Sequence, residues 1–401
     1  MKKNLNKFFN PKKIAVIGAS SNPKKVGGIL VEKLKKFKGK TYYINIKNET
    51  INKQKSFSSI KKIKDKIDLA IIATPAHTVL KIIKECVIKK IKNILIISAG
   101  FSEIKNFSLE KKITKLTKEN KINLLGPNCF GIVNPKLNLD LTFSNNSAKP
   151  GDTAFISQSG ALWSYVSDLN IGFSGFVSLG NMADLNFCDW INYFSKDKST
   201  KKIILYIEKI KDGKEFIKVC KKSKKEIIAI KSGKTKKGEA AAISHTGSIA
   251  TNYKIYQGAF KQAKIKSTES FGKAFNLKIN KFPIKNKNAI IITNAGGAGA
   301  LITDKLIENK NNLIKPPTDI LGTATAKDYK KEIDKLEKQN FSGKIIIIFT
   351  PQKIENPKEI AKEIIKSKLK KNIIAFFLGE KSILESIKIL KENNVKTINK
   401  I

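Results

Sequence analysis

The chain has 401 residues, 41% of them hydrophobic, which predicts two to four domains with substantial cores. No uninterrupted apolar run approaches the roughly 20 residues of a membrane-spanning helix, so we expect no membrane segment. The formal net charge is +45, but all 78 basic residues are lysine. Recognition of bases and phosphates usually relies on the planar fork of arginine. We therefore attribute this charge to a compositional bias and expect no specific nucleic-acid partner.

The N-terminus and the cysteines indicate a cytoplasmic protein. The basic N-terminal segment runs into a Gly-Ala-Ser turn, which is typical of a strand and not of a signal peptide. The four cysteines are far apart, with no CxxC pair, so we expect buried free thiols and no zinc site or disulfide. These cysteines are Cys86, Cys129, Cys188 and Cys220.

Residues 1–145 alternate short β-branched runs with lysine-rich amphipathic segments. The predicted strands are 13–19, 41–46, 69–76, 93–100 and 122–128, with helices such as 78–90 and 108–119 between them. This alternation predicts a parallel, doubly wound sheet, which binds ligands at the carboxyl ends of its strands. Small and polar residues gather at those ends: Gly18, Ala19, Ser20, Ser21, Thr74, Pro75, Ser98, Ala99, Gly100, Gly126, Pro127 and Asn128.

The first turn, in the segment "VIGASSNPKKVGG", lies between a predicted strand and a predicted helix. Such a turn directs backbone N–H groups and a helix N-terminus toward an anion. It lacks the full GxGxxG spacing, which weakens an NAD interpretation. No acidic residue ends the next predicted strand to hold a ribose diol, and Lys47 suits a phosphate better. A turn without any ligand remains the alternative.

Two breaks divide the rest of the chain. A Pro/Gly/Asn-rich stretch at 145–155 precedes a second α/β series, with predicted strands at 153–160, 175–181, 203–210 and 226–233. A second break at 278–288 precedes a third series, with strands that begin near 289, 343 and 372. We therefore expect three doubly wound α/β domains, at 1–145, 146–282 and 283–401.

The segment "FISQSGALW" predicts a strand, a Ser/Gly turn and the start of a helix. Ser157, Ser159 and Gly160 can present N–H and hydroxyl donors to a phosphate at that helix N-terminus. An esterase nucleophile elbow is the rival interpretation, but Ile156 stands where the elbow requires glycine. The segment "NAGGAGALITD" predicts a third turn of the same kind, so several anion-binding turns point together to phosphate chemistry.

The segment "EAAAISHTGSIA" is a nearly neutral island that carries His245, one of only two histidines. Its small residues predict a mobile loop. The other histidine, His77, lies in a different predicted domain, so a zinc site lacks ligands. An incidental or structural histidine remains open, as does a Ser-His-Asp triad without an elbow. The pattern favours an imidazole that attacks phosphorus itself, with Glu208, at a strand end, as its supporting carboxylate or as an ordinary solvated side chain.

Eight segments, in order, cover nearly the whole chain and carry a family likeness. The chain resembles the α-subunit of NDP-forming acyl-CoA synthetases, the ADP-forming acetyl-CoA synthetase group, and more distantly the α-subunit of succinyl-CoA synthetase. The segments are "VIGASSNPKKVGG", "SAGFSE", "LLGPNCFGIVNP", "FISQSGAL", "VSLGNMADLNFCDWI", "LYIEKIKDGKEF", "KSGKTKKGEAAAISHTGSIA" and "TNAGGAGALITD".

This resemblance implies a Rossmann-like CoA-binding domain followed by two flavodoxin-like ligase domains. It implies that His245 is phosphorylated during turnover and that Glu208 supports it, with no metal bound by the chain itself. The helix after Ser157, Gln158, Ser159 and Gly160 would hold the phosphoryl group. Coenzyme A would lie on Gly18, Ala19, Ser20, Ser21, Asn22, Lys47, Ser98, Ala99 and Gly100, with Thr74, Pro75 and Asn128 at the same edge.

The resemblance also implies a partner. In the family, an acyl-CoA and phosphate give an acyl phosphate, which phosphorylates the histidine. The histidine loop then swings to an ATP-grasp module, where ADP with Mg²⁺ becomes ATP. No segment after residue 283 supplies that module, so we expect an ATP-grasp β-subunit. The acyl group and the choice of ADP or GDP are not readable, and a non-catalytic CoA-binding or regulatory protein is the alternative.

Overall fold

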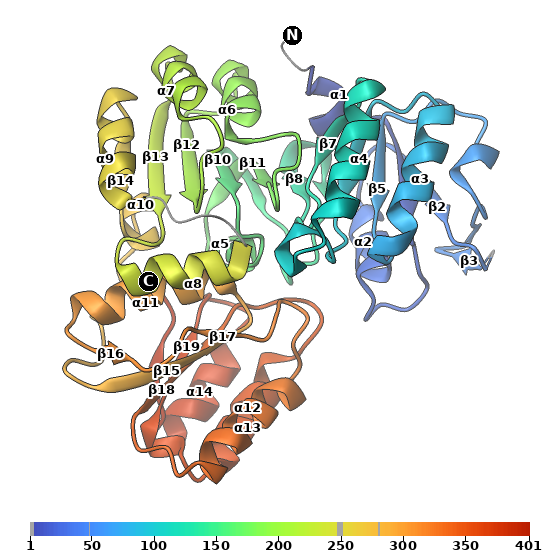
Figure 1. Cartoon of the computed structure of the whole chain (residues 1–401). Helices are drawn as coiled ribbons and strands as arrows, with labels where there is room; N and C mark the ends of the chain where they lie inside the picture. Colours follow the sequence, from blue (N-terminus) through green and yellow to red (C-terminus); the bar gives the residue numbers. More distant parts are fainter. Residues whose placement is uncertain (1–3, 48, 247–251, 280) are drawn as a thin grey trace.

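A computed structural model of the chain describes residues 4–47, 49–246, 252–279 and 281–401, the side chains of 243–246 excepted (Figure 1). Over this range the chain forms three large, mainly parallel sheets of five, seven and six strands, flanked by helices. The predicted α/β architecture is therefore confirmed. The colour blocks of Figure 1 follow the three sheets in chain order, blue to teal, green to yellow, and orange to red.

The first sheet is parallel and has the order β2-β1-β5-β6-β7. Because the order reverses between β1 and β5, the ligand crevice of such a sheet lies outside the carboxyl ends of these two strands. Its strands are β1 (Lys13–Ile17), β2 (Lys40–Ile44), β5 (Leu69–Ile72), β6 (Asn93–Ile96) and β7 (Asn123–Leu125), with a small hairpin of β3 (Thr50–Ile51) and β4 (Gln54–Lys55) beside them. Its helices are α1 (Asn6–Phe9), α2 (Val26–Leu34), α3 (Ala76–Ile88) and α4 (Phe107–Glu119).

The second sheet has the order β14-β13-β12-β10-β11-β8-β9 and reverses between β10 and β12. Its last two strands, β8 (Ile132–Asn134) and β9 (Leu139–Asp140), come from the segment before the break at 145 and extend the sheet in antiparallel fashion. The parallel strands are β10 (Lys149–Ser157), β11 (Gly172–Ser178), β12 (Lys202–Ile207), β13 (Glu226–Lys231) and β14 (Lys266–Thr268). The helices are α5 (Ala161–Asp168), α6 (Phe187–Lys196), α7 (Gly213–Lys222), α8 (Lys236–Thr246), α9 (Tyr253–Gln262) and α10 (Phe271–Ala274).

The third sheet has the order β16-β15-β18-β19-β20, with β17 also paired to β15. It repeats the strand order of the second sheet and reverses between β15 and β18. Its strands are β15 (Asn288–Thr293), β16 (Asn312–Leu313), β17 (Thr318–Asp319), β18 (Lys344–Phe349), β19 (Ile373–Phe377) and β20 (Lys396–Ile398). Its helices are α11 (Gly296–Glu308), α12 (Ala326–Lys338), α13 (Pro357–Lys366) and α14 (Leu384–Glu392).

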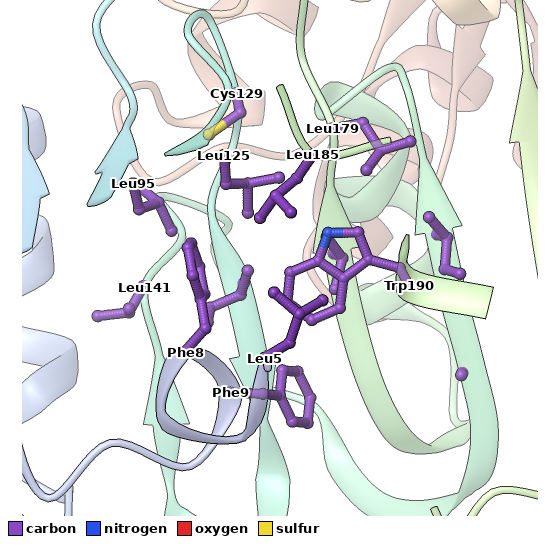
Figure 2. Packing of buried hydrophobic residues seen from close by; sticks show 14 of the residues in the cluster. Leu5, Phe8, Phe9, Leu95, Leu125, Cys129, Leu141, Leu179, Leu185 and Trp190 are labelled. Atoms are coloured by element: carbon purple, nitrogen blue, oxygen red, sulfur yellow. The ribbon is translucent and has the colours of Figure 1, made fainter. Parts of the chain in front are cut away.

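An aromatic cluster joins the first two sheets. Phe8 and Phe9 of α1 pack edge-to-face on Trp190 of α6, with ring centroids 5.7 and 6.0 Å apart. Leu125 at the end of β7 and Leu185 before α6 belong to the same buried cluster (Figure 2). Edge-to-face aromatic pairs add stabilisation beyond the area that they bury, so this joint fixes the two strand edges side by side.

The predicted loop around the histidine is wrong for residues 236–246, because they form α8. Thr235 begins this helix, since its hydroxyl accepts a hydrogen bond from the Gly238 N–H at 3.0 Å. The alanines at 240–242 then supply the highest helix propensity of any residue type. Residues 247–251, the rest of the island, lie outside the described residues.

Burial explains the chemistry of the cysteines. All four are buried free thiols, as the sequence predicts, and desolvation raises the pKa of each to about 12. Among the residues described, no helix has the length and apolar character needed to cross a membrane. The same part of the chain contains no group of three or more His, Cys, Asp or Glu side chains that could hold a metal ion.

Candidate active site

The carboxyl edge of the first sheet brings the predicted CoA residues into contact with one another. A Cβ added to Gly18 would meet the Thr74 side chain at 2.8 Å, so the turns after β1 and β5 touch at the switch point. Ser98 after β6 donates its hydroxyl to the Thr74 carbonyl oxygen, and its own carbonyl accepts the Asn128 N–H at 2.9 Å. Four separate segments of the sequence therefore meet at one edge.

Two positions at the turn after β1 require glycine, one in the turn itself and one in the helix that packs on it. Gly18 has φ +89°, a left-handed conformation that other residues rarely adopt. A Cβ on Gly27, in the first turn of α2, would overlap the Gly18 carbonyl oxygen. Helix α2 therefore packs directly on the turn. Ser21 and Asn22 are exposed on its outer side, where the Asn22 N–H donates to Ser20 Oγ at 3.1 Å.

An acidic residue lies beside this turn, although none stands at the end of β2. Glu49 Oε2 lies 3.4 Å from both Ser21 Oγ and Asn45 Nδ2. Asn45 also donates to the Ala19 carbonyl oxygen at 3.0 Å, and its Oδ1 accepts the Lys47 N–H at 2.8 Å. The side chain of Lys47 is exposed, so this corner offers an ammonium and a carboxylate together. Glu49 lies five residues beyond β2, whereas a ribose-binding acid is expected directly at the end of the strand.

The four predicted phosphate residues divide into two pairs. Ser157 donates its hydroxyl to the Ser159 carbonyl oxygen at 2.6 Å, and Gln158 Oε1 accepts the Glu208 and Lys209 N–H groups at 2.6 and 2.7 Å. Both side chains are therefore used to build the turn. Ser159 is 1% exposed, and its Oγ has no hydrogen-bond partner among the described residues. Together with Gly160, which begins α5, it presents an unused buried donor at a helix N-terminus.

A second helix N-terminus meets the first at this point. The Gly297 backbone, in the first turn of α11, lies so close to Ser159 that an added Cβ would be 2.6 Å from its hydroxyl. Tyr206 donates its buried hydroxyl to the Gly297 carbonyl oxygen at 3.0 Å and holds the two turns together. The sequence predicts the glycine-rich turn of α11 but not that this turn lies beside Ser159. The sequence signal for this contact is the strand–turn–helix pattern that the segments "FISQSGALW" and "NAGGAGALITD" share.

Glu208 lies at the switch point of the second sheet, one residue after β12, and is 7% exposed. Lys231 ends the neighbouring strand β13, in register with Ile207. Burial lowers the pKa of the Lys231 ammonium, and the attraction of Glu208 opposes that shift. Burial, reinforced by the Glu208 charge, raises the pKa of the Tyr206 hydroxyl well above its usual range. The predicted carboxylate is therefore in a buried, polar corner and is not a solvated strand end.

Helix α8 carries the backbone of His245 in its last turn and lies alongside α11 (Figure 1). Ala241 and Ala242 of α8 pack on Ala300 of α11, and these small side chains allow a close approach. The side chain of His245 lies outside the described residues. Its helix nevertheless runs over the same α11 whose N-terminus meets Ser159.

The edges of the first and second sheets are linked by polar contacts. Asn181, after β11, donates to Glu103 Oε2 at 2.7 Å and to Glu110 Oε2 at 2.8 Å. Its Oδ1 accepts a hydrogen bond of 3.3 Å from Asn128. Glu103 in turn accepts the Phe101 N–H at 3.1 Å, next to the turn that ends β6. The loops at the carboxyl ends of β6 and β7 in the first sheet thus contact the loop at the carboxyl end of β11 in the second.

Comparison with known proteins gives matches to both halves of this arrangement. Residues 12–135 match a family described as CoA binding domain, and residues 150–278 match one described as Succinyl-CoA ligase like flavodoxin domain. The α subunit of acetate–CoA ligase (ADP-forming) II from Pyrococcus furiosus is 37% identical, over 98% of this chain and 94% of that protein. Acetate–CoA ligase (ADP-forming) from Methanocaldococcus jannaschii is 44% identical, over 79% of this chain but 49% of that protein.

A solved structure shares the whole fold. The dinucleotide forming acetyl-coenzyme A synthetase 1 from Candidatus Korarchaeum cryptofilum, determined in complex with phosphate and ADP, has a TM-score of 0.66 and 33% sequence identity. The match covers 98% of this chain and 93% of that one. The chain thus spans about half the length of the Methanocaldococcus relative and nearly all of the Pyrococcus and Korarchaeum chains.

Proposed function

Because this chain belongs to the family of α subunits of ADP-forming acid–CoA ligases, we propose that it binds coenzyme A at its first sheet and carries a phosphoryl group on His245. The observation that supports this proposal best is the junction of two helix N-termini at Ser159. A buried hydroxyl without a partner in the described part of the chain, beside two sets of helix N–H donors, suits a phosphoryl group.

The chemistry proceeds in two steps. An oxygen of inorganic phosphate attacks the thioester carbonyl of an acyl-CoA, the C–S bond breaks, and the thiol of coenzyme A leaves with an acyl phosphate formed. An imidazole nitrogen of His245 then attacks phosphorus, the bond between phosphorus and the acyl oxygen breaks, and a carboxylate leaves. Glu208 accepts the N–H of the other imidazole nitrogen and stabilises the positive charge that develops on the ring. Each step is reversible.

The residues at the first crevice fit coenzyme A. The turn at 18–22 packs against α2 and exposes Ser21 and Asn22, and it faces the turn at Thr74 across the switch point. These groups, with the nearby Lys47 ammonium, would hold the phosphates and the nucleotide end. Bound coenzyme A would supply the thiol that leaves or attacks. The Asn128–Asn181 contact, which links the loops after β7 and β11, supports a position of this crevice near the second one, where the phosphoryl group would be carried.

The second half of turnover requires a partner in this proposal. The Pyrococcus relatives are named α subunits, which implies a further subunit in those enzymes. We propose an ATP-grasp β-subunit that binds ADP with Mg²⁺ and receives the phosphoryl group from His245. Acetate is the default acid. We keep the cytoplasm as the expected compartment.

Gly27→Ala should weaken coenzyme A binding about tenfold, because the new Cβ would overlap the Gly18 carbonyl oxygen and force the turn away from α2. Isothermal titration with coenzyme A measures the effect. Gly258→Ala is the matched control, since an added Cβ there meets nothing within 4 Å. Equal affinities for the Gly27→Ala and wild-type proteins would contradict the placement of coenzyme A on this turn.

The proposed carrier is tested by incubating the full chain with ³²P-labelled acetyl phosphate. The wild-type protein should gain an acid-labile, base-stable phosphoryl group. His245→Ala should gain none, whereas His77→Ala, which removes the exposed second histidine, should label as the wild type does. Label that persists in His245→Ala would rule out this carrier. Coenzyme A binding without any labelling of the wild type would favour the non-catalytic alternative.

A further inference from the structure

The second and third sheets repeat each other down to single hydrogen bonds. Ser157 ends β10 and donates its hydroxyl to the Ser159 carbonyl oxygen at 2.6 Å. Thr293 ends β15 and donates its hydroxyl to the Ala295 carbonyl oxygen at 3.0 Å. Helices α5 and α11 follow these two turns and pack against each other. The two turns and their helices therefore form a local internal repeat.

Two buried aspartates occupy equivalent positions in this arrangement. Asp168 ends α5 and is 2% exposed, while Asp304 lies in α11 and is 5% exposed. The separation between them along the chain equals that between Ser157 and Thr293. Each reaches into the other sheet's domain, where it receives hydrogen bonds from the turn that follows the strand two places from β15 (for Asp168) or from β10 (for Asp304). These turns follow β19 and β13, respectively.

The two aspartates make matching contacts. Asp168 accepts the Glu380 N–H at 2.7 Å, the Ser382 N–H at 3.1 Å and the Ser382 hydroxyl at 2.9 Å. Asp304 accepts four hydrogen bonds from the turn after β13. They come from the Gly233 N–H at 2.8 Å, the Lys234 N–H at 3.0 Å, the Thr235 N–H at 2.8 Å and the Thr235 hydroxyl at 2.9 Å.

The two turns lead to different helices. The turn that Asp304 holds begins α8, which ends with the histidine-bearing turn. The hydroxyl that Thr235 donates to Asp304 is the same group that accepts the Gly238 N–H and begins α8. A Cβ on Gly238 would overlap the Asp304 carboxylate, so the first turn of α8 lies directly on it. The turn that Asp168 holds instead leads to α14, which contains none of the predicted site residues.

We propose that Asp304 is a positioning residue for phosphoryl transfer, because its carboxylate fixes the start and the direction of α8 and so places the last turn of that helix. Asp168 holds the same two domains together but positions no reacting group. This inference rests on the role proposed for His245. Both carboxylate oxygens of Asp304 accept backbone N–H groups of the turn. An amide in place of the carboxylate would therefore point its NH₂ group at an N–H donor.

The test compares Asp304→Asn with Asp168→Asn in the full chain, with ³²P-labelled acetyl phosphate as the probe. We expect Asp304→Asn to label about 100-fold more slowly at saturation, with an unchanged half-saturating concentration, because a small displacement of a reacting group has effects of this size. Asp168→Asn, which loses an equivalent buried clamp, should label within about threefold of the wild type. Thermal unfolding should show similar destabilisation of both.

Milder variants test the same inference even if the aspartate variants fail to fold. Thr235→Val removes the cap hydroxyl and should slow labelling, Thr235→Ser should restore it, and Ser382→Ala should leave it unchanged. Equal rates for Asp304→Asn and Asp168→Asn, or for Thr235→Val and Ser382→Ala, would overturn the inference. A wild-type chain that takes no label at all would instead contradict the proposed function, and the inference with it.

Discussion

Glu208→Gln should slow phosphorylation of the chain by acetyl phosphate about 100-fold or more, within the range that a positioned acid–base partner contributes. The substitution keeps the shape of the buried side chain but removes the charge that would stabilise the imidazolium. The backbone N–H of residue 208 would still donate to Gln158 Oε1, so the turn should survive. Rapid-quench labelling at saturating acetyl phosphate measures the rate.

Glu215→Gln is the matched control for this prediction. Glu215 lies in the first turn of α7, where its side chain is 43% exposed and pairs with Lys218 at 3.4 Å. Such a surface pair contributes at most about 1 kcal/mol, so the control should label at the wild-type rate. If Glu208→Gln also labelled at that rate, the carboxylate would have no part in the transfer, and its burial would be purely structural.

Lys33→Met should lower the free energy of unfolding by about 3–5 kcal/mol, the usual result of removing one partner from a buried ion pair. Lys33 in α2 contacts Asp140 at 2.6 Å, and both side chains are 6% exposed. The ammonium also donates to Ser144 Oγ at 3.0 Å. Burial lowers its pKa, an effect that the attraction of Asp140 opposes. Removing it leaves a buried carboxylate beside the segment that enters β10. Urea denaturation measures the loss.

Two further variants separate charge from packing in that prediction. Lys35→Met, nearby in sequence, removes an exposed pair with Glu32 and should change stability by less than about 1 kcal/mol. Lys33→Met combined with Asp140→Leu should recover much of the loss, because no unpaired charge then remains buried. A single Lys33→Met variant as stable as Lys35→Met would show that the buried pair does not join α2 to the second sheet.

The sequence predicted the sheets well because β-branched runs such as "KIIIIF" and "EIIAIK" have few alternatives to a buried parallel strand. It also placed Ser159 and Glu208 at strand ends, and the order of the second sheet brings those ends together at its switch point. The strand ends can be predicted because the small and polar residues of each turn directly follow the strand in the sequence. The domain division at 145 and 283 stays a prediction, while β8 and β9 show that the segment before 145 completes the second sheet.

What the sequence could not give depends on contacts between distant segments. The prediction of a loop around His245 followed from small residues, but Thr235 and the packing of Ala241 on Ala300 make residues 236–246 helical. The approach of Gly297 to Ser159 joins turns that follow strands of the third and the second sheet. The roles of Asp168 and Asp304 could not be predicted from the sequence. A buried aspartate is recognised by its hydrogen-bond donors, and those donors lie far away in the chain.

The central claim is that one chain joins coenzyme A chemistry to a phosphoryl group on His245, and a single-turnover chase tests it most directly. The ³²P-labelled chain would be freed of acetyl phosphate, mixed with acetate and coenzyme A, and sampled by peptide mass spectrometry and thioester assay. We predict label on residue 245 alone, lost as equal amounts of acetyl-CoA and labelled phosphate form, and slow loss if acetate is omitted. Label on another residue, or label that acetate and coenzyme A together do not remove, would contradict it.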